Sequence, residues 1–278
     1  MTASRRTALA TALALVLTPA MPLRAQPAAA FDAHHAAWTA LLQKHVQLQR
    51  GGQASTVRYA GMAADRDALA AYLGRLSALS ASDHGAFTPA QQKAFLINAY
   101  NAFTVELILT RYPKLESIKD LGSLLQSPWK KAWIPLLGRT VSLDDIEHGL
   151  LRERGRFDDP RIHFAVNCAS IGCPMLREEA YVAERLDAQL EQQTQRFLSD
   201  RTRNRYNAAR GRLEVSKIFD WYGEDFALGH RGIRSLPAFF AAHAELLADA
   251  PADRERLRSQ KVELSFLDYD WALNDAKR

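Results

Sequence analysis

Apolar residues recur at helical spacing through the first half of the chain. The pattern predicts helices over 31–50 and 62–80, and Gly51-Gly52 ends the first of them. A third helix begins at Thr88-Pro89-Ala90-Gln91, because Thr is a good N-cap, Pro suits the first helical position and Gln can complete a capping box. This first half is therefore predicted to be mainly helical.

The second half mixes short alternating segments with helical ones. The expected hairpin covers 133–142, the expected strands are 161–166, 213–216 and 262–267, and the expected helices are 183–199 and 235–247. Helices followed by a few interspersed strands indicate an α+β (or mixed α/β) fold. We expect a helical N-terminal half packed on a small sheet in a single compact domain.

The N-terminus has the composition of an export signal. Arg5 and Arg6 precede the apolar run 8–17, which is too short to span a bilayer, and Ala25 ends a plausible cleavage site. Residues 1–25 are therefore predicted to be a signal peptide of the Sec or twin-arginine type, with an uncleaved anchor as the alternative. The protein would be periplasmic or secreted, without stable membrane insertion after cleavage. Residues 31–85 would form an N-terminal helical region and 86–278 the domain with the site.

Charge gives little sign of a nucleic-acid partner. The formal net charge is +5, but loss of Arg5, Arg6 and Arg24 with the signal leaves only +2. A basic cluster remains at 201–212, yet it lacks the interleaved aromatic residues expected for binding single strands. We therefore expect no nucleic-acid binding.

Both cysteines lie in one loop, Cys168 and Cys173, directly after an apolar run that contains His163. Three kinds of site remain open. An exported protein with two cysteines can bridge them in a disulfide. Cys168 can instead be a thiol nucleophile. The two thiols together with His148 and His163 would also supply enough ligands for zinc, although no usual zinc spacing is present.

Polar residues elsewhere are candidates for the same site. Asn98 and Asn101 flank Tyr100 within an apolar helix, where buried amides need partners, so they are either core hydrogen-bonding residues or part of a binding surface. Ser142 is the expected N-cap of a short helix that carries Glu147 and His148.

Five ordered blocks over about residues 90–275 resemble the domain-of-unknown-function 547 family. The blocks are Asn98-Ala99-Tyr100-Asn101-Ala102, Ser142 to His148, His163 to Cys168 with Cys173-Pro174, Ile218 to Tyr222 with Asp225-Phe226, and Tyr269 to Asn274. The resemblance implies a shared site built by the blocks from Asn98 to Cys173, with the aromatic blocks packed around it. It implies no substrate. Members of the family also occur in reducing compartments, which favours a free thiol.

Our leading interpretation is a thiol-dependent hydrolase or acyltransferase, possible kin of papain-like or transglutaminase-like enzymes by analogy. Cys168 would be the nucleophile, His148 or His163 the base, and Glu147 or Asn167 the orienting group or oxyanion donor. The alternative is a non-catalytic periplasmic binding module for a peptide, a glycan or a small molecule. The residues that would line its cleft are Asn98, Tyr100, Asn101, Trp221 and Tyr222, with Cys168 and Cys173 bridged. A metal-dependent hydrolase comes third. We expect no cofactor and no metal.

Overall fold

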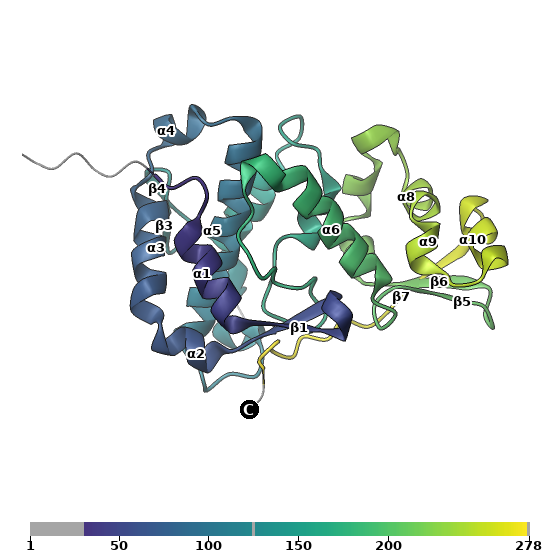
Figure 1. Ribbon diagram of the computed structural model, residues 1–278, viewed down its shortest axis with the longest axis horizontal. Coiled ribbons are helices and arrows are strands. Elements are labelled where there is room, and N and C mark those ends of the chain that lie inside the picture. Colours follow the sequence, from purple (N-terminus) through teal and green to yellow (C-terminus); the bar gives the residue numbers. More distant parts are fainter. Residues whose placement is uncertain (1–30, 124–125, 277–278) are drawn as a thin grey trace, which may run out of the picture. The chain divides into compact units, whose positions relative to one another are not determined.

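Helices and loops make up most of the chain, and the sheets are small (Figure 1). The computed structural model describes residues 31–123 and 126–276. The predicted signal peptide at 1–25 therefore lies outside the described residues. The helices are α1 (Ala36–His45), α2 (Tyr59–Ala64), α3 (Arg66–Ala78), α4 (Ala81–Gly85), α5 (Pro89–Leu109), α6 (Leu186–Ser199), α7 (Ile218–Trp221), α8 (Leu236–Ala242), α9 (Ala244–Leu247) and α10 (Pro251–Arg258).

The strands form three separate small sheets, so the fold is α+β, as predicted, but without one central sheet. The antiparallel pairs are β1 (Val46–Gln49) with β2 (Ala54–Val57) and β3 (Ile134–Leu136) with β4 (Arg139–Val141). The third sheet has the order β5 (Arg205–Asn207), β6 (Arg212–Val215) and β7 (Glu263–Phe266), and its β6–β7 pair is parallel.

Helix α5 is the centre of the larger apolar core. The predicted capping box is present, with the Gln91 N–H donating to the Thr88 side chain and the Gln91 side chain accepting from the Thr88 N–H. The helix has 21 residues, and most of those from Ala94 to its end are buried, as expected for a helix that is apolar on every side. Helix α3 lies beside it, and α1 lies beside α3 (Figure 1).

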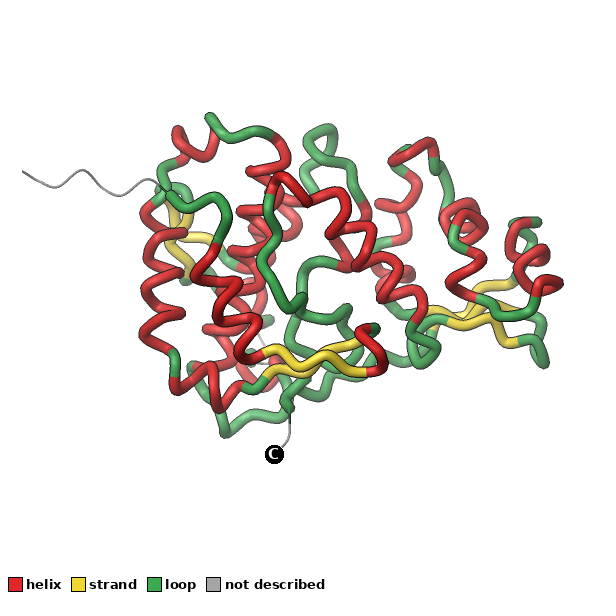
Figure 2. Tube along the Cα trace, in the orientation of Figure 1, coloured by secondary structure: helices red, strands yellow, loops and turns green. Residues whose placement is uncertain are grey.

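A second apolar core is built mainly from phenylalanines, including Phe164, Phe197, Phe219, Phe226, Phe239 and Phe240. Helix α6 joins the two cores, because Leu190 on its first half belongs to the larger one and Phe197 near its end belongs to the second. Figure 2 shows the loops that follow α5 and precede α6 in the chain, and these loops supply part of the candidate site.

Several predicted helices are shorter than expected or are interrupted in the structure. The helix expected over 31–50 ends at His45 and continues as β1, since Val46 to Gln49 pairs with β2 through the Gly51-Gly52 turn. The helix expected over 62–80 breaks at Asp65, whose carboxylate binds Lys44 and His45. The helix expected over 235–247 breaks at His243, whose Nδ1 bonds the carbonyl of Phe239.

The prediction of a strand over 161–166 was wrong. Residues Pro160–Phe164 form a 3₁₀ helix, and the Asp159 side chain accepts from the Arg161 N–H at its start. The whole turn is buried, so its apolar run carries no alternation that distinguishes a strand from a buried helical turn. The strands expected at 213–216 and 262–267 and the hairpin expected at 133–142 are confirmed.

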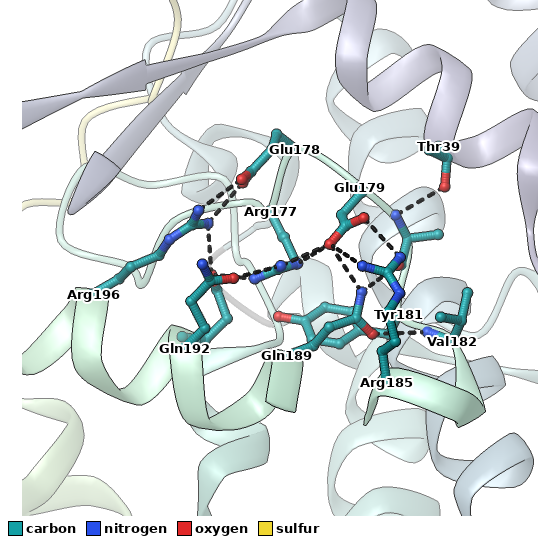
Figure 3. Close-up of polar contacts among 12 residues, drawn as sticks. Thr39, Arg177, Glu178, Glu179, Tyr181, Val182, Arg185, Gln189, Gln192 and Arg196 are labelled. Atoms are coloured by element: carbon teal, nitrogen blue, oxygen red, sulfur yellow. Dashed lines mark hydrogen bonds and ion pairs between the residues drawn. The ribbon is translucent and has the colours of Figure 1, made fainter. Parts of the chain in front are cut away.

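An ion-pair network fixes the segment after Cys173 to helix α6 (Figure 3). Arg196 on α6 pairs with Glu178 over 2.7 Å, while Arg177 pairs with Glu179 and donates to the Gln192 side chain. Gln193 also donates to the carbonyls of Phe164 and Met175. The two chain segments that flank the cysteine loop are therefore held by the same helix.

Arginines of the basic cluster at 201–212 form ion pairs within the fold. Arg205, Arg210 and Arg212 all contact the Glu214 carboxylate, and Arg201 pairs with Asp249. No helix among the described residues combines the length and the apolarity needed to cross a bilayer.

Candidate functional site

Buried amides hold the cysteine loop in place. Asn101 on α5 donates to the carbonyl of Ala165 over 2.9 Å and accepts from the Asn167 N–H over 2.8 Å. The Asn167 side chain in turn donates to the carbonyl of Pro174 and accepts from the Ala169 N–H. These bonds satisfy buried polar groups on both sides of the loop. Asn101 and Asn167 therefore shape the loop from behind.

Asn98, one turn earlier on α5, holds a different segment, at Tyr181. Its side chain donates to the carbonyl of Tyr181 over 2.8 Å and accepts from the Tyr181 N–H over 3.0 Å. Asn98 is also buried. Asn98 and Asn101 are thus both buried, and each is hydrogen-bonded to the backbone.

The C-terminal segment closes over the other side of the loop. The N–H groups of Ile171 and Gly172 donate to the carbonyls of Ala272 and Asp270, both over 2.8 Å. A Cβ on Gly172 would lie 3.0 Å from the backbone of Asp270 and from the Tyr269 ring. This close approach brings Tyr269 beside Cys168.

A cleft of about 310 Å³ lies where these segments meet. Its lining comes from α5, the Asp144–His148 turn, the cysteine loop, α7 and the C-terminal segment. The lining residues are Tyr100, Ser127, Trp129, Asp144, Glu147, His148, His163, Val166, Cys168, Cys173, Pro174, Ile218, Trp221, Tyr222, Tyr269 and Trp271. A concave, largely apolar pocket with a few polar groups is the usual form of a small-molecule or substrate site.

Both thiols are free, so the disulfide of the alternative interpretation is not formed. The backbone N–H of Cys168 donates to Cys173 Sγ over 3.0 Å. Cys168 is half-buried, and its Sγ lies 3.2 Å from both Ser170 Oγ and Tyr269 Oη. Cys168 therefore faces the cleft with three potential donors around its sulfur, while Cys173 is buried behind it.

These neighbours favour the thiolate of Cys168. Hydrogen bonds from Cys173, Ser170 and Tyr269 outweigh the effect of burial and lower the pKa of Cys168 to about 7. Burial, together with the hydrogen bond to Cys168, raises the pKa of Cys173 well above its usual value. The reactive form of the pair at neutral pH is thus the Cys168 thiolate.

His163 is oriented by a carboxylate. Its Nε2 lies 2.7 Å from Asp225 Oδ2, and its ring stacks on Tyr222 with 4.1 Å between ring centroids. Arg152 binds the same carboxylate through two nitrogens, at 2.6 and 3.2 Å. Burial would raise the pKa of Asp225, but the hydrogen bonds from His163 and Arg152 hold that pKa below its usual value. Asp225 is therefore an ionised acceptor.

That contact also determines the tautomer of His163. A neutral imidazole that donates Nε2–H to Asp225 carries its lone pair on Nδ1. His163 Nδ1 is buried and has no hydrogen-bond partner among the described residues. A fully buried imidazole with an unused basic nitrogen therefore borders the cleft.

Glu147 and His148 lie on a π-helix, Asp145–Leu151, in which the Arg152 N–H donates to the Glu147 carbonyl over 2.9 Å. The predicted cap is present, since Ser142 Oγ accepts from the Asp145 N–H. Single π-turns are frequent at functional sites. His148 Nδ1 accepts a hydrogen bond from the Arg152 guanidinium, and Nε2 lies 3.6 Å from Asp144. Glu147 faces the Tyr222 hydroxyl, and burial together with this carboxylate raises the pKa of Tyr222.

Aromatic rings form part of the cleft lining. Trp221, Tyr269 and Trp271 contact one another with ring centroids 4.5–5.8 Å apart. Trp129 meets Trp271 edge-on at 5.8 Å. Trp221 is 43% exposed, which is unusual for so large an apolar side chain. We refer to Trp129, Trp221, Tyr269 and Trp271 as the aromatic wall.

Most of the predicted site residues meet in this cleft. The lining contains Tyr100, Glu147, His148, His163, Cys168, Cys173, Trp221 and Tyr222. Asn98, Asn101 and Asn167 do not belong to it. The sequence reasoning did not assign roles to Asp225, Arg152, Ser170 and Tyr269. Two of these, Asp225 and Tyr269, lie in blocks that carry the family resemblance, and this was the available signal.

The four residues considered for zinc do not gather around a point. Among the described residues, no three histidine, cysteine, aspartate or glutamate side chains are arranged to hold a metal ion.

Comparison with known proteins gives one match. Residues 85–198 match the family described as "Protein of unknown function, DUF547", a range that contains α5, the π-helix, the cysteine loop and most of α6. Neither the curated proteins nor the solved structures contain a significant match to the chain.

Proposed function

Since the chain belongs to the DUF547 family through residues 85–198, and that family has no known function, we propose its activity from the cleft: a thiol-dependent hydrolase or acyltransferase with Cys168 as nucleophile. The observation that carries the proposal is the position of the Cys168 sulfur. It lies in the cleft 3.2 Å from each of two hydroxyl oxygens, in the same lining as a carboxylate-oriented imidazole.

His163 is the base in this proposal. The order Asp225, His163, Cys168 is that of a triad in which the carboxylate fixes the tautomer and the imidazole takes the proton of the nucleophile. His148 is less suited, because its Nδ1 already accepts a hydrogen bond from Arg152. The hydrogen bonds of the Cys168 sulfur go to Ser170 and Tyr269, so we propose that thiol and imidazole pair when substrate binds.

The chemistry would proceed in two steps. The Cys168 thiolate attacks the carbonyl carbon of an acyl donor, and the imidazolium of His163 returns a proton to the leaving group as the thioester forms. Water or a second nucleophile then attacks the thioester, His163 removes its proton, and the thiolate is released. Tyr269 and Ser170 would hold the sulfur in its reactive position.

A non-catalytic binding module is the second candidate, and the aromatic wall favours it. Rings exposed to a cleft bind ligands without any need for a nucleophile. The two candidates differ in the effect of Cys168→Ser, which would end turnover in an enzyme and leave ligand affinity nearly unchanged in a binding module.

Labelling with chloroacetamide tests the assignment of the nucleophile. We expect modification of the wild type and of Cys173→Ala at one site, and none of Cys168→Ala. Labelling confined to Cys173 would overturn the proposal, as would sulfurs already joined in the purified protein. Export stays part of the proposal, and N-terminal sequencing of the protein from a periplasmic fraction tests it.

A further inference from the structure

The cleft combines aromatic rings with negative charge. Its lining contains six tyrosine or tryptophan rings and two carboxylates, Asp144 and Glu147. Within the described part of the chain, no lysine or arginine belongs to that lining. The cleft thus presents ring faces and carboxylates to a ligand, and it has few groups that recognise an anionic ligand.

The positive charges nearby are already engaged. Arg152 binds Asp225 and lies over the Tyr222 ring at 4.9 Å. Lys119 lies over the Trp271 ring with its ammonium 3.8 Å from the centroid. The second contact shows that a ring of the aromatic wall accepts an ammonium group at short range. His148 lies beside Asp144, yet the Asp144 side chain keeps 33% of its surface exposed.

From these features we infer that the cleft binds the organic ammonium group of its substrate, between the aromatic wall and the Asp144 carboxylate. Ring faces attract cations because their quadrupole is negative on the face. A carboxylate in the same lining attracts a cation and has no such attraction for a neutral ligand. The inference rests on the proposed function only in placing this cation in the same cleft as Cys168.

A sugar ligand is the main competitor, since sugars also stack on tryptophan. Sugar recognition needs several hydrogen-bond donors and acceptors spread around the ring, usually including amide side chains. The amides of Asn98, Asn101 and Asn167 are instead bonded to backbone carbonyls. The cleft therefore suits an ammonium group better than a polyol.

Ligand affinity measured by tryptophan fluorescence at fixed ionic strength tests the inference. The probes are choline and its neutral carbon isostere, in which a tert-butyl group replaces the trimethylammonium. Pentylammonium and pentanol serve as the matching primary pair. We expect at least one cation to bind roughly tenfold more tightly than its neutral partner. Equal affinities within both pairs would overturn the inference, as would binding of an N-acetylglucosamine oligomer alone.

Variants locate the cation. Asp144→Asn and Trp221→Leu should each weaken binding of the cation about threefold or more. Asp220→Asn is the matched control, because Asp220 is an exposed acid next to Trp221 that pairs with Lys217 outside the cleft. An equal loss with Asp220→Asn would contradict the assignment. Trp221 is partly exposed, so its replacement should leave the fold intact.

The outcome is separable from that of the proposed function. If choline binds selectively and no thioester ever forms on Cys168, the catalytic proposal fails and this inference stands. If a thioester forms while charged and neutral probes bind equally, only this inference fails.

Discussion

The Cys168 N–H donates a hydrogen bond to Cys173 Sγ over 3.0 Å, and the Cys173 thiol in turn is the main group that stabilises the Cys168 thiolate. The two cysteines therefore act as a pair without a covalent bond. Cys173 is buried behind the loop, whereas Cys168 borders the cleft. Cys173 therefore holds Cys168 in position and lowers the pKa of its thiol.

The alkylation rate of Cys168 should follow a titration with a midpoint near pH 7, because the pKa of this thiol is lowered to about 7. The thiolate is the reactive form, so the rate rises with pH through that midpoint. Cys173→Ala should move the midpoint upward, since it removes the hydrogen-bond donor that lowers the pKa of Cys168 most. Cys173→Ser keeps a donor and should move it less. A midpoint unchanged by both substitutions would refute the role given to Cys173.

Asn101→Ala should lower the free energy of unfolding by about 2–4 kcal/mol, because a buried carbonyl and a buried N–H each lose their partner. It should also shift the midpoint of Cys168 alkylation, since the freed groups flank the cysteine loop. Urea denaturation and the alkylation profile measure the two effects. Asn98→Ala is the control: it should destabilise by a similar amount and leave the alkylation midpoint in place, because Asn98 binds Tyr181 instead.

Gly172→Ala should destabilise the protein by about 1–3 kcal/mol and disturb the position of Tyr269. The new methyl group would lie 3.0 Å from backbone atoms of Asp270, which cannot move away as a flexible side chain does. Gly74→Ala in α3 meets no atom within 4 Å and should be neutral or stabilising. Equal stabilities for both variants in thermal denaturation would show that the C-terminal segment does not press on the loop.

The pairing of Asp225 should make stability depend on pH. Because its pKa is held below the usual value, its stabilising effect is full above the ordinary aspartate range and fades as the pH falls toward the folded-state value. Asp225→Ala should cost about 3–5 kcal/mol at pH 7, since it leaves Arg152 and His163 without their buried acceptor. The difference from the wild type in urea denaturation should shrink at pH 3. A constant difference would argue against an ionised Asp225.

Local signals in the sequence predicted many of the elements correctly. The Thr88 capping box and the hairpin near Gly138 depend on neighbours in the chain, and the strands at 213–216 and 262–267 were predicted from their local residue pattern. The turn Pro160–Phe164 was missed, because a segment buried on all sides loses the alternation that identifies a strand. Asp65 interrupts a helix through a contact with His45, 20 positions away in the chain, which short-range patterns do not contain.

The sequence predicted many of the residues of the site, but it did not predict how they are arranged. The cysteine loop, the Glu147-His148 pair and the Trp221-Tyr222 pair could be picked out because their residue types are chemically distinctive. The link between His163 and Asp225 spans 62 positions and depends on the packing of the second core, so no local pattern indicates it. Asn98 and Asn101 fitted both interpretations, since a buried amide needs a partner in either case.

Trapping of an acyl-enzyme tests the central claim most directly. The protein would be mixed with p-nitrophenyl acetate, quenched in acid and analysed by intact mass and peptide mapping. We predict one acetyl group on Cys168 in the wild type and in Cys173→Ala, slower acetylation in His163→Ala, and none in Cys168→Ser. Acetylation that persists in Cys168→Ser, or a wild type that is never acetylated while Cys168 is free, would contradict the account.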